Sequence, residues 1–523
     1  MINVPYRPTR RALLRNAGAL LATTALPLDF LAGRGLIPAA LAQEMPFDRS
    51  IVVSMARELA KKEFVPPSTE LPEAFADLTY DQYRDIRSDR GQAIWADEGL
   101  PFHLQLFHRG FYFANKIDVA TVENDEARHL AYSPDLFVFG PLVPRPLPTE
   151  DIGFAGIRLL GRINQPDAYD EVAVFQGASY FRSLGRNQSY GLSARGLALN
   201  TAAPEGEEFP LFRSFWVEKP LPDSQTVVVH ALLDSPSVSG AYRFSIRPGT
   251  ATVMDVEAVL FPRVELARVG LAPGTSMFFF GPNDRGDVDD YRPEVHDSDG
   301  LLMVNGRGER LWRPLANPKV LQTSAFVDAA PRGFGLIQRN RDLTAYEDFE
   351  AAYEKRTSLW VEPVGDWGRG TVTLIEIPSE AEIHDNIVAY WAPAEPIRAG
   401  TEFSVAYRLF WGQEPPLPTG GVHVSATRSG RAGVEGPTPV RLFVVDYVAT
   451  DTQSMVSAPE PQATVAASAG KVDHVVLHRN PATGGWRLAF QLDPEDAELI
   501  ELRAVLDFPD RRPTEIWMYR WTS

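Results

Sequence analysis

Hydrophobic and polar residues alternate in short segments along most of the chain. The segments occur at residues 102–114, 135–140, 225–233, 241–248, 274–281, 370–378 and 402–411. Gly, Pro, Asp or Asn separates such segments at intervals of about 8–12 residues, a spacing typical of antiparallel sandwiches and barrels. Units that alternate strands with helices would need long helical patterns between the segments. The pattern therefore predicts an all-β fold.

Two segments have the spacing of a helix instead. Residues 49–64 are the clearest case and include the basic pair Lys61-Lys62 near the end. Residues 346–356 form a second candidate. We predict helices there because apolar positions three or four residues apart line one face of a helix.

A change of composition at residues 412–421 (GQEPPLPTGG) divides the chain. Proline stiffness flanked by glycine is typical of a linker. We therefore predict a large β-sandwich body over residues 43–411 and a smaller domain over residues 422–523. Strand-like segments continue in the smaller domain, whose size and rhythm predict one immunoglobulin-like β-sandwich.

The composition excludes several kinds of site and partner. The 523 residues are 44% hydrophobic, which is enough to fill sizeable cores. The absence of cysteine excludes disulfides, Cys-type zinc sites, iron–sulfur clusters and thiol nucleophiles. A formal net charge of −17 opposes binding to phosphate backbones, so nucleic acid is excluded as a partner.

The first 42 residues have the features of an export signal. Residues 9–14 (TRRALL) carry a twin-arginine pattern, and a mildly apolar run follows over residues 17–28. Residues 40–42 (ALA) offer small side chains for cleavage before Gln43. The run is too short to span a bilayer. We expect a periplasmic protein, exported by the twin-arginine route and not stably inserted in the membrane; an ordinary first helix is the alternative.

Several familiar sites are missing. No GxGxxG, GxxxxGK[ST] or HExxH motif occurs, and residues 191–195 (GLSAR) lack the closing glycine of a GxSxG elbow. The acidic stretch over residues 287–299 lacks the spacing of a calcium loop. The sequence therefore predicts no metal and no cofactor.

Carboxylates beside aromatic residues remain as candidate chemistry. Two His-Asp pairs occur, His296-Asp297 and His384-Asp385, each next to a strand-like segment. Sugars need flat aromatic faces together with carboxylates and arginines for their hydroxyls. The candidate substrate-binding residues near the two pairs are Arg292, Glu294, Tyr346, Glu347, Trp360, Tyr390 and Trp391.

Cleavage of a glycosidic bond needs one carboxylic acid to protonate the leaving oxygen and one carboxylate to activate water. Desolvation beside aromatic residues would raise the pKa of Asp385, which suits the acid. The alternative is structural: a loop aspartate commonly caps a turn, and an aromatic residue at strand spacing commonly belongs to the core.

Long strings of the sequence resemble the periplasmic glucan biosynthesis proteins G and D of the osmoregulated glucan pathway. The resemblance runs from Phe47 to the C-terminus and is looser in the last domain, where NPATGGWRL near Asn480 carries it. The main strings are YSPDLFVFG from Tyr132, GASYFR from Gly177, YGLSARGLALNTA from Tyr190, GEEFPLFRSFW from Gly206, ALLDSPSVSGAYRF from Ala231, TSMFFFGPN from Thr275, YRPEVHDSDGL from Tyr291, WRPLANP from Trp312, GFGLIQRNRDL from Gly333 and DNIVAYW from Asp385.

The resemblance implies a galactose-mutarotase-like β-sandwich body with a groove, joined to an immunoglobulin-like domain. It further implies an inverting glycoside hydrolase that acts on β-1,2-glucan and controls the glucose backbone of periplasmic glucans. Carried over by motif, Asp385 is the general acid and Asp297 is the base, acting through a relay for which Tyr346 and Glu347 are candidates. The twin-arginine signal is more typical of protein D, which favours that member.

Two other readings stay open at this point. The chain could be a non-catalytic glucan-binding or assembly factor that hands chains on from the membrane glucan synthase. It could also be a transglycosylase, in which a sugar hydroxyl replaces water. The two aspartates favour the hydrolase.

Overall fold

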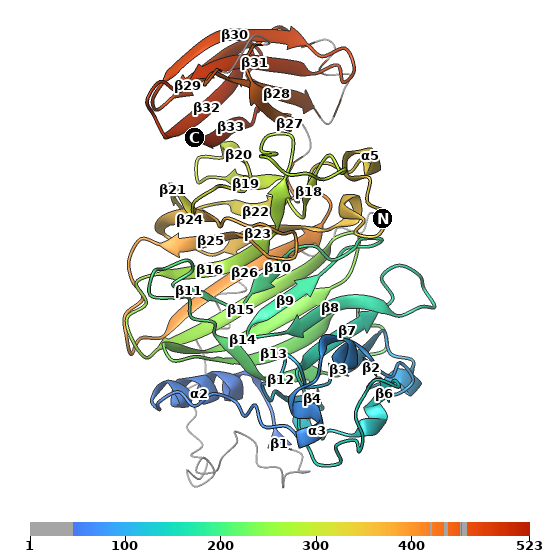
Figure 1. Cartoon of the computed structure of the whole chain (residues 1–523). Coiled ribbons are helices and arrows are strands. Elements are labelled where there is room, and N and C mark those ends of the chain that lie inside the picture. The colour runs from blue at the N-terminus through green and yellow to red at the C-terminus, as the bar shows by residue number, and fades with distance from the viewer. Residues whose placement is uncertain (1–44, 419–420, 434–437, 450, 452–454, 456–457) are drawn as a thin grey trace, which may run out of the picture.

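The computed structural model describes residues 45–418, 421–433, 438–449, 451, 455 and 458–523 (Figure 1). The predicted signal over residues 1–42 lies outside them. Two large sheets form the body, and a smaller unit of strands covers one end. None of the helices described is long and apolar enough to cross a membrane.

The larger sheet has fifteen strands, mostly antiparallel. Their order is β1 (Met45–Pro46), β5 (Glu126–His129), β4 (Asp118–Glu123), β12 (Leu211–Glu218), β13 (Val227–Asp234), β14 (Val238–Arg247), β15 (Thr252–Pro262), β26 (Phe403–Gly412), β23 (Ser358–Val364), β22 (Gly333–Ile337), β19 (Gly300–Val304), β20 (Arg310–Pro314), β33 (Ile516–Thr522), β32 (Leu499–Asp507) and β29 (Gln462–Ala467).

The second large sheet has ten strands and packs on the first. Its order is β21 (Gln322–Ala329), β24 (Arg369–Glu376), β25 (Ile387–Pro393), β16 (Val269–Ser276), β10 (Ser193–Arg195), β9 (Tyr180–Ser183), β8 (Asp170–Gln176), β7 (Gly156–Gly161) and β3 (Phe102–Phe107), with β11 (Ala198–Leu199) paired to β16. Buried side chains from both sheets form the main core, among them Phe175, Phe244 and Trp411. The predicted β-rich fold is therefore confirmed for the body.

The C-terminal strands are not separate from the body. A four-stranded sheet of β27 (Val422–Arg431), β28 (Arg441–Ala449), β31 (Trp486–Asp493) and β30 (Lys471–Arg479) encloses a core with β33, β32 and β29. Strand β33 pairs in parallel with β20 of the body, so the larger sheet runs on into this C-terminal unit. A β-sandwich is present, but an immunoglobulin-like topology is not specifically shown. The chain forms no strand between Gly412 and Val422 among the residues described there.

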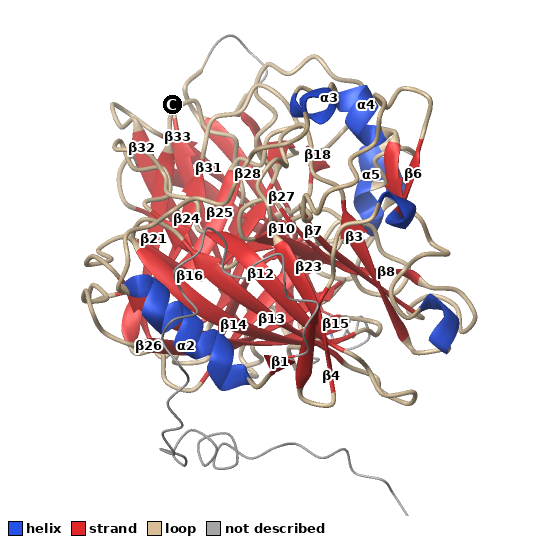
Figure 2. Cartoon of the chain, turned by 90° about the horizontal axis from the view of Figure 1, so that it is seen from below, coloured by secondary structure: helices blue, strands red, loops and turns tan. Residues whose placement is uncertain are grey.

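Helix α2 (Arg49–Ala60) confirms the first helix prediction. Asp48 caps it by accepting a hydrogen bond from the Ser50 amide at 2.6 Å, and Val52 and Ala56 are buried. The helix lies across β13, β14 and β15 on the face turned away from the main core (Figure 2). Three short α-helices follow in the body, within the residues described: α3 (Glu73–Ala76), α4 (Tyr80–Arg84) and α5 (Leu343–Tyr346).

The second helix prediction, over residues 346–356, is wrong. Helix α5 ends at Tyr346, and a single 3₁₀ turn follows only at Tyr353–Lys355. Glu347 and Ala352 have φ values of 53° and 46°, which no helix accommodates. Between them the Asp348 carboxylate accepts hydrogen bonds from the amides of Glu350 and Ala351, so a local turn replaces the helix.

Two two-stranded ribbons complete the fold. Strand β2 (Ile86–Ser88) pairs with β6 (Phe137–Phe139) near the short helices. Strand β17 (Phe278–Phe280), which follows β16 directly, pairs with β18 (Val295–His296). The second ribbon places both predicted catalytic segments.

Candidate active site

Asp297 follows β18 and is held in place by its backbone and its side chain. Its amide donates to the Met277 carbonyl at 2.8 Å, and its carboxylate forms an ion pair with the Arg356 guanidinium. The residue is 4% exposed. Gly191 lies against the pair, because a Cβ there would stand 2.9 Å from the Arg356 Cβ and 3.4 Å from the Asp297 Cγ. Only glycine allows this close approach.

Asp385 stands just before β25, and its neighbour Asn386 fixes it there. The Asn386 side chain is buried; it accepts from the Phe278 amide at 2.9 Å and donates to the Phe278 carbonyl at 2.9 Å. Phe278 also pairs with His296 on the other strand of the ribbon. Strand β17 is therefore the common anchor that brings residues 297 and 385 to one place.

The two carboxylates differ in exposure but influence each other. Burial raises the pKa of Asp297; the charge of Asp385 acts in the same direction, and Arg356 opposes both. Asp385 is exposed, yet the surrounding protein desolvates its carboxyl group in part and raises its pKa, against the charges of Arg182, Arg195 and Arg356. Both carboxyl groups thus have the raised pKa that is typical of a candidate acid–base site.

Arginines and a tyrosine of the ten-stranded sheet face the same site. Tyr180 and Arg182 of β9 point away from the core because Phe181 between them points into it. The Arg182 Nε donates to the Ser193 hydroxyl at 2.7 Å. On the next strand, Arg195 donates to the Thr275 hydroxyl at 2.9 Å, pairs with Glu207, and lies over the Tyr180 ring.

No single residue type in the sequence pointed to these groups. Arg182 lies in the string GASYFR, whereas Gly191 and Arg195 lie in YGLSARGLALNTA. Both strings carry the family resemblance, so the signal was present but pointed to no particular chemistry. Strand pairing between residues 194 and 181 is what turns these side chains to one face.

Among the predicted aromatic residues, only Tyr390 is partly exposed, and it lies near these groups. Its pKa is raised by desolvation and by the charge of Glu207. The predicted contact with sugar needs correction for the other three aromatic residues, because their side chains are buried. Trp391 and Tyr346 are 0% exposed and Trp360 is 2% exposed. Trp391 fills the main core, Trp360 fills the core shared with the C-terminal unit, and Tyr346 packs in a small cluster beside β17 and β18. None of these three presents a face to a sugar.

The predicted polar residues lie around the site rather than in it. Arg292 forms ion pairs with Asp290, Asp348 and Glu382, and so ties together three loops. Glu347 is exposed at the end of α5, and its carbonyl lies 3.5 Å from the Tyr291 hydroxyl. Neither side chain has a contact with Asp297 or Asp385 among those that the structure gives.

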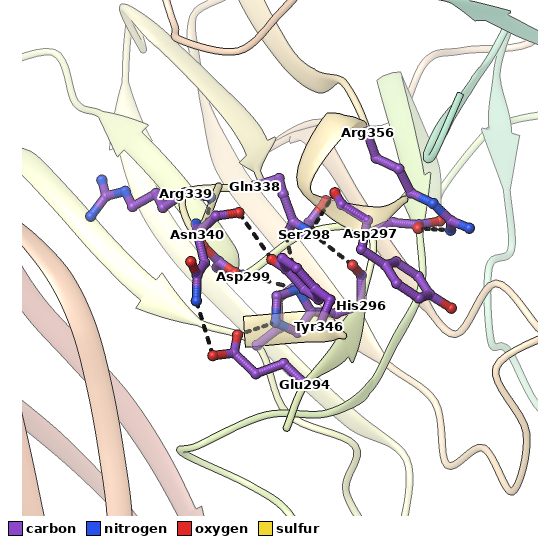
Figure 3. A network of polar contacts seen from close by, with 12 residues as sticks. Glu294, His296, Asp297, Ser298, Asp299, Gln338, Arg339, Asn340, Tyr346 and Arg356 are labelled. Atoms are coloured by element: carbon purple, nitrogen blue, oxygen red, sulfur yellow. Dashed lines mark hydrogen bonds and ion pairs between the residues drawn. The ribbon is translucent and has the colours of Figure 1, made fainter. Parts of the chain in front are cut away.

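Glu294 belongs to a buried network beneath Asp297 (Figure 3). The His296 Nε2 lies 2.9 Å from the Glu294 carboxylate, and its Nδ1 lies 2.8 Å from the Gln338 Oε1 and 3.3 Å from Asp299. Gln338 must present its oxygen to the ring, because its Nε2 donates to the His296 carbonyl at 2.9 Å.

Within the residues that the structure describes, Glu294, His296 and Asp299 form one group whose ligand atoms lie within 4.8 Å of one another. The two carboxylates lie at opposite nitrogens of the ring, an arrangement that two ring N–H donors satisfy without an ion. Burial alone would lower the pKa of His296, but Asp299 and Glu294 outweigh burial and raise it, which favours the imidazolium.

Comparison with known proteins identifies the family. The family model described as "Periplasmic glucan biosynthesis protein, MdoG" matches residues 47–521. The chain belongs to this family. It is 59% identical over 476 residues to Glucans biosynthesis protein G of Shewanella baltica (strain OS195), which covers 91% of this chain and 87% of the relative. It is 58% identical to Glucans biosynthesis protein G of Vibrio cholerae serotype O1 (strain M66-2), with the same coverage.

These relatives correct one sequence-based preference. The twin-arginine pattern favoured family member D, whereas the similar relatives are named protein G. An export signal can differ between relatives, and the matched segments lie in the body and the C-terminal unit. Among solved structures, a galactose mutarotase related enzyme from Lactobacillus acidophilus matches with a TM-score of 0.21 and 8% identity, covering 45% of this chain and 96% of that one.

Proposed function

We propose that this member of the periplasmic glucan biosynthesis family acts on β-1,2-glucan as an inverting glucanase that trims or remodels the glucose backbone. The observation that carries the proposal is the meeting of two family-motif aspartates at one ribbon, β17–β18, beside Arg182, Arg195 and Tyr180. A sugar chain needs such a combination of carboxylates, arginines and an aromatic ring.

The two aspartates have distinct roles in this proposal. Asp385 is exposed and has a raised pKa, so it is the acid that protonates the departing glycosidic oxygen. Asp297 is buried and paired with Arg356, so it activates the attacking water from a distance, through intervening hydroxyls or waters. Inversion follows because water attacks the face opposite to the leaving group.

The earlier relay candidates receive little support. The Tyr346 hydroxyl donates to the Asn340 carbonyl at 3.0 Å and is buried away from solvent, and Glu347 is exposed at the surface. Tyr353 is better situated, since its ring lies under the Arg356 guanidinium at 4.0 Å and its hydroxyl donates to Glu382 at 3.1 Å. We leave the relay unassigned and keep only the two aspartates in catalytic roles.

The cellular setting is part of the proposal. Export by the twin-arginine route follows from residues 9–14, and the membrane glucan synthase is the partner that would supply the chains. The similar relatives carry names that describe biosynthesis, not hydrolysis. That wording, together with the Arg356 pair that engages Asp297, supports a second candidate: a glucan-binding or assembly factor without turnover.

The test is release of reducing ends from purified linear β-1,2-glucan by the mature protein. Asp385→Asn should reduce turnover by about 10²–10⁴-fold, the usual contribution of a general acid, while leaving glucan affinity within about twofold. Asp297→Asn should also abolish release. Asp366→Asn is the matched control, because this aspartate only accepts from the Gly368 amide in an exposed turn.

The outcomes separate the candidate functions. Retained turnover in Asp385→Asn would refute the acid assignment. Glucan binding without release in the unmodified protein would establish the binding factor instead. New chain lengths without new reducing ends would indicate transfer to a sugar hydroxyl. The anomeric configuration of the first product, followed by proton NMR, tests inversion.

A further inference from the structure

A continuous series of polar contacts, each at least partly buried, connects the C-terminal unit to the segment that contains Asp297. The series begins at Glu515, which directly precedes β33 and is 3% exposed. Its two carboxylate oxygens accept from the Arg339 guanidinium of the body at 2.7 Å and 2.9 Å. One oxygen also accepts from the Val424 amide at 3.0 Å, so Glu515 is held by its own unit as well.

Arg339 passes this restraint to the loop beside Asp297 (Figure 3). The guanidinium lies over the Trp312 ring, with its Cζ 3.4 Å from the ring centroid, which helps to fix the side chain. The backbone amides of Arg339 and Asn340 both donate to the same Asp299 oxygen, at 2.5 Å and 2.8 Å. Asp299 is two residues from Asp297, and its amide is bonded in turn to the Ile337 carbonyl at 2.8 Å.

The hydrogen bonds around His296 connect the same residues by a second route. Asn340 donates to Glu294 at 3.0 Å, and the ring of His296 lies between Glu294 and Asp299. A cavity of about 50 Å³ borders these four residues and is also lined by Ser425, Ala426 and Thr427 of β27. The C-terminal unit therefore lies directly against the buried network and not only against the ends of the body strands.

We propose that the C-terminal unit is a positioning element for Asp297: Glu515, acting through Arg339 and Asp299, holds residues 295–300 in the conformation that presents this carboxylate. The functional half of this inference rests on the proposed role of Asp297; the structural half does not. Glu515 is buried and does not touch Asp297 among the contacts given for it, so it is a positioning residue. The C-terminal unit then contributes to turnover although it supplies no catalytic group.

The chain offers a matched pair of variants for the test. Glu515→Gln keeps the shape of the side chain but removes its charge. Glu501→Gln does the same at a second bridge between the unit and the body, where Glu501 pairs with Arg520 at 2.6 Å and Arg520 donates to the Thr323 carbonyl at 2.9 Å. That second bridge has no connection to residues 295–300 among the contacts given for it.

Two readouts are expected to separate the variants. Glu515→Gln should lower kcat on β-1,2-glucan by about tenfold to a hundredfold, the scale expected when a catalytic group is displaced, with KM within about twofold. Hydrogen exchange should quicken in residues 295–300 and 337–341. Glu501→Gln should leave kcat and the exchange of both segments unchanged. Arg339→Lys keeps the charge but loses the two-pronged bond, so it should have the same effects as Glu515→Gln. It replaces Glu515→Gln in the test if Glu515→Gln folds poorly.

Each result decides the matter. Equal kcat values and equal exchange in the two glutamine variants would overturn the inference. If the unmodified protein releases no reducing ends, the proposed function is wrong. The hydrogen exchange data alone then test whether Glu515 restrains residues 295–300. Faster exchange of residues 295–300 in Glu515→Gln but not in Glu501→Gln would support that restraint even in that case.

Discussion

At the scale of single residues, the site depends on how three arginines share two carboxylates. Arg356 pairs with Asp297, whereas Arg182 and Arg195 act on Asp385 through space. Desolvation raises both carboxyl pKa values and the arginines restrain that rise. Because desolvation is the larger effect, Asp385 stays protonated to higher pH than an isolated aspartate.

This balance predicts a pH effect with a definite sign. Arg182→Gln removes a positive charge that lowers the pKa of both Asp385 and Asp297, so both pKa values should rise. The acid then stays protonated to higher pH and the base becomes ionised only at higher pH. The whole pH profile of kcat/KM should therefore move upward.

Measurement of kcat/KM across the acidic and neutral range checks this shift. Arg186→Gln is the control, because Arg186 is exposed and its Nε donates only to the Ile163 carbonyl at 2.9 Å among the contacts given for it. A downward shift in the Arg182 variant, or an equal shift in both variants, would contradict the assignment of Asp385 as the acid.

At the scale of elements, the faces of β16 and β25 decide which aromatic side chains meet solvent. Alternation along β25 sends Trp391 into the main core and turns Tyr390 outward. The ring of Tyr390 rests on Gly270 of β16, where a Cβ would stand 2.5 Å from the Tyr390 Cγ. A glycine at this strand position thus sets how close the ring lies to the sheet.

Gly270→Ala should force the Tyr390 ring outward. Overpacking of this kind costs about 1–3 kcal/mol in the free energy of unfolding, and glucan affinity should fall if Tyr390 contacts the chain. Urea unfolding and a glucan-binding titration measure the two effects. Gly430→Ala in β27 is the control, because no atom lies within 4 Å of the added Cβ. Unchanged stability and affinity in the Gly270 variant would show that the ring has room to move.

At the scale of the whole molecule, the body and the C-terminal unit share one core. Trp312 and Trp360 from the body pack in the same cluster as Phe443 and Trp517 from the C-terminal unit, and β20 pairs with β33. A shared core of this kind couples the unfolding of the two parts, because neither part can open without exposing apolar surface of the other.

Trp517→Ala should therefore destabilise the entire chain by about 3–5 kcal/mol, the usual cost of removing a buried tryptophan. Calorimetry should show one unfolding transition at a lower temperature, and hydrogen exchange should quicken in β19 of the body. Tyr112→Ala is the control, since this aromatic side chain is 83% exposed. Two separate transitions, with that of the body unchanged, would show that the units are independent.

The sequence by itself determined the strand content, the first helix and the family, and it singled out the two aspartates as candidates. These properties are local, or they are carried by long motifs, so the period-two pattern and strings such as YRPEVHDSDGL were sufficient. The helix expected over residues 346–356 failed because Asp348 offered the backbone a competing turn.

Only the tertiary structure decided which groups surround the aspartates. Trp360 and Trp391 were predicted to bind sugar, but strand pairing places both side chains inside hydrophobic cores. Strand pairing also turns Arg182 and Arg195 toward Asp385. Which face of a strand is buried depends on the sheet that packs against it, and that partner lies far away in the sequence. The contact of Glu515 with Arg339, separated by 176 residues, arises for the same reason.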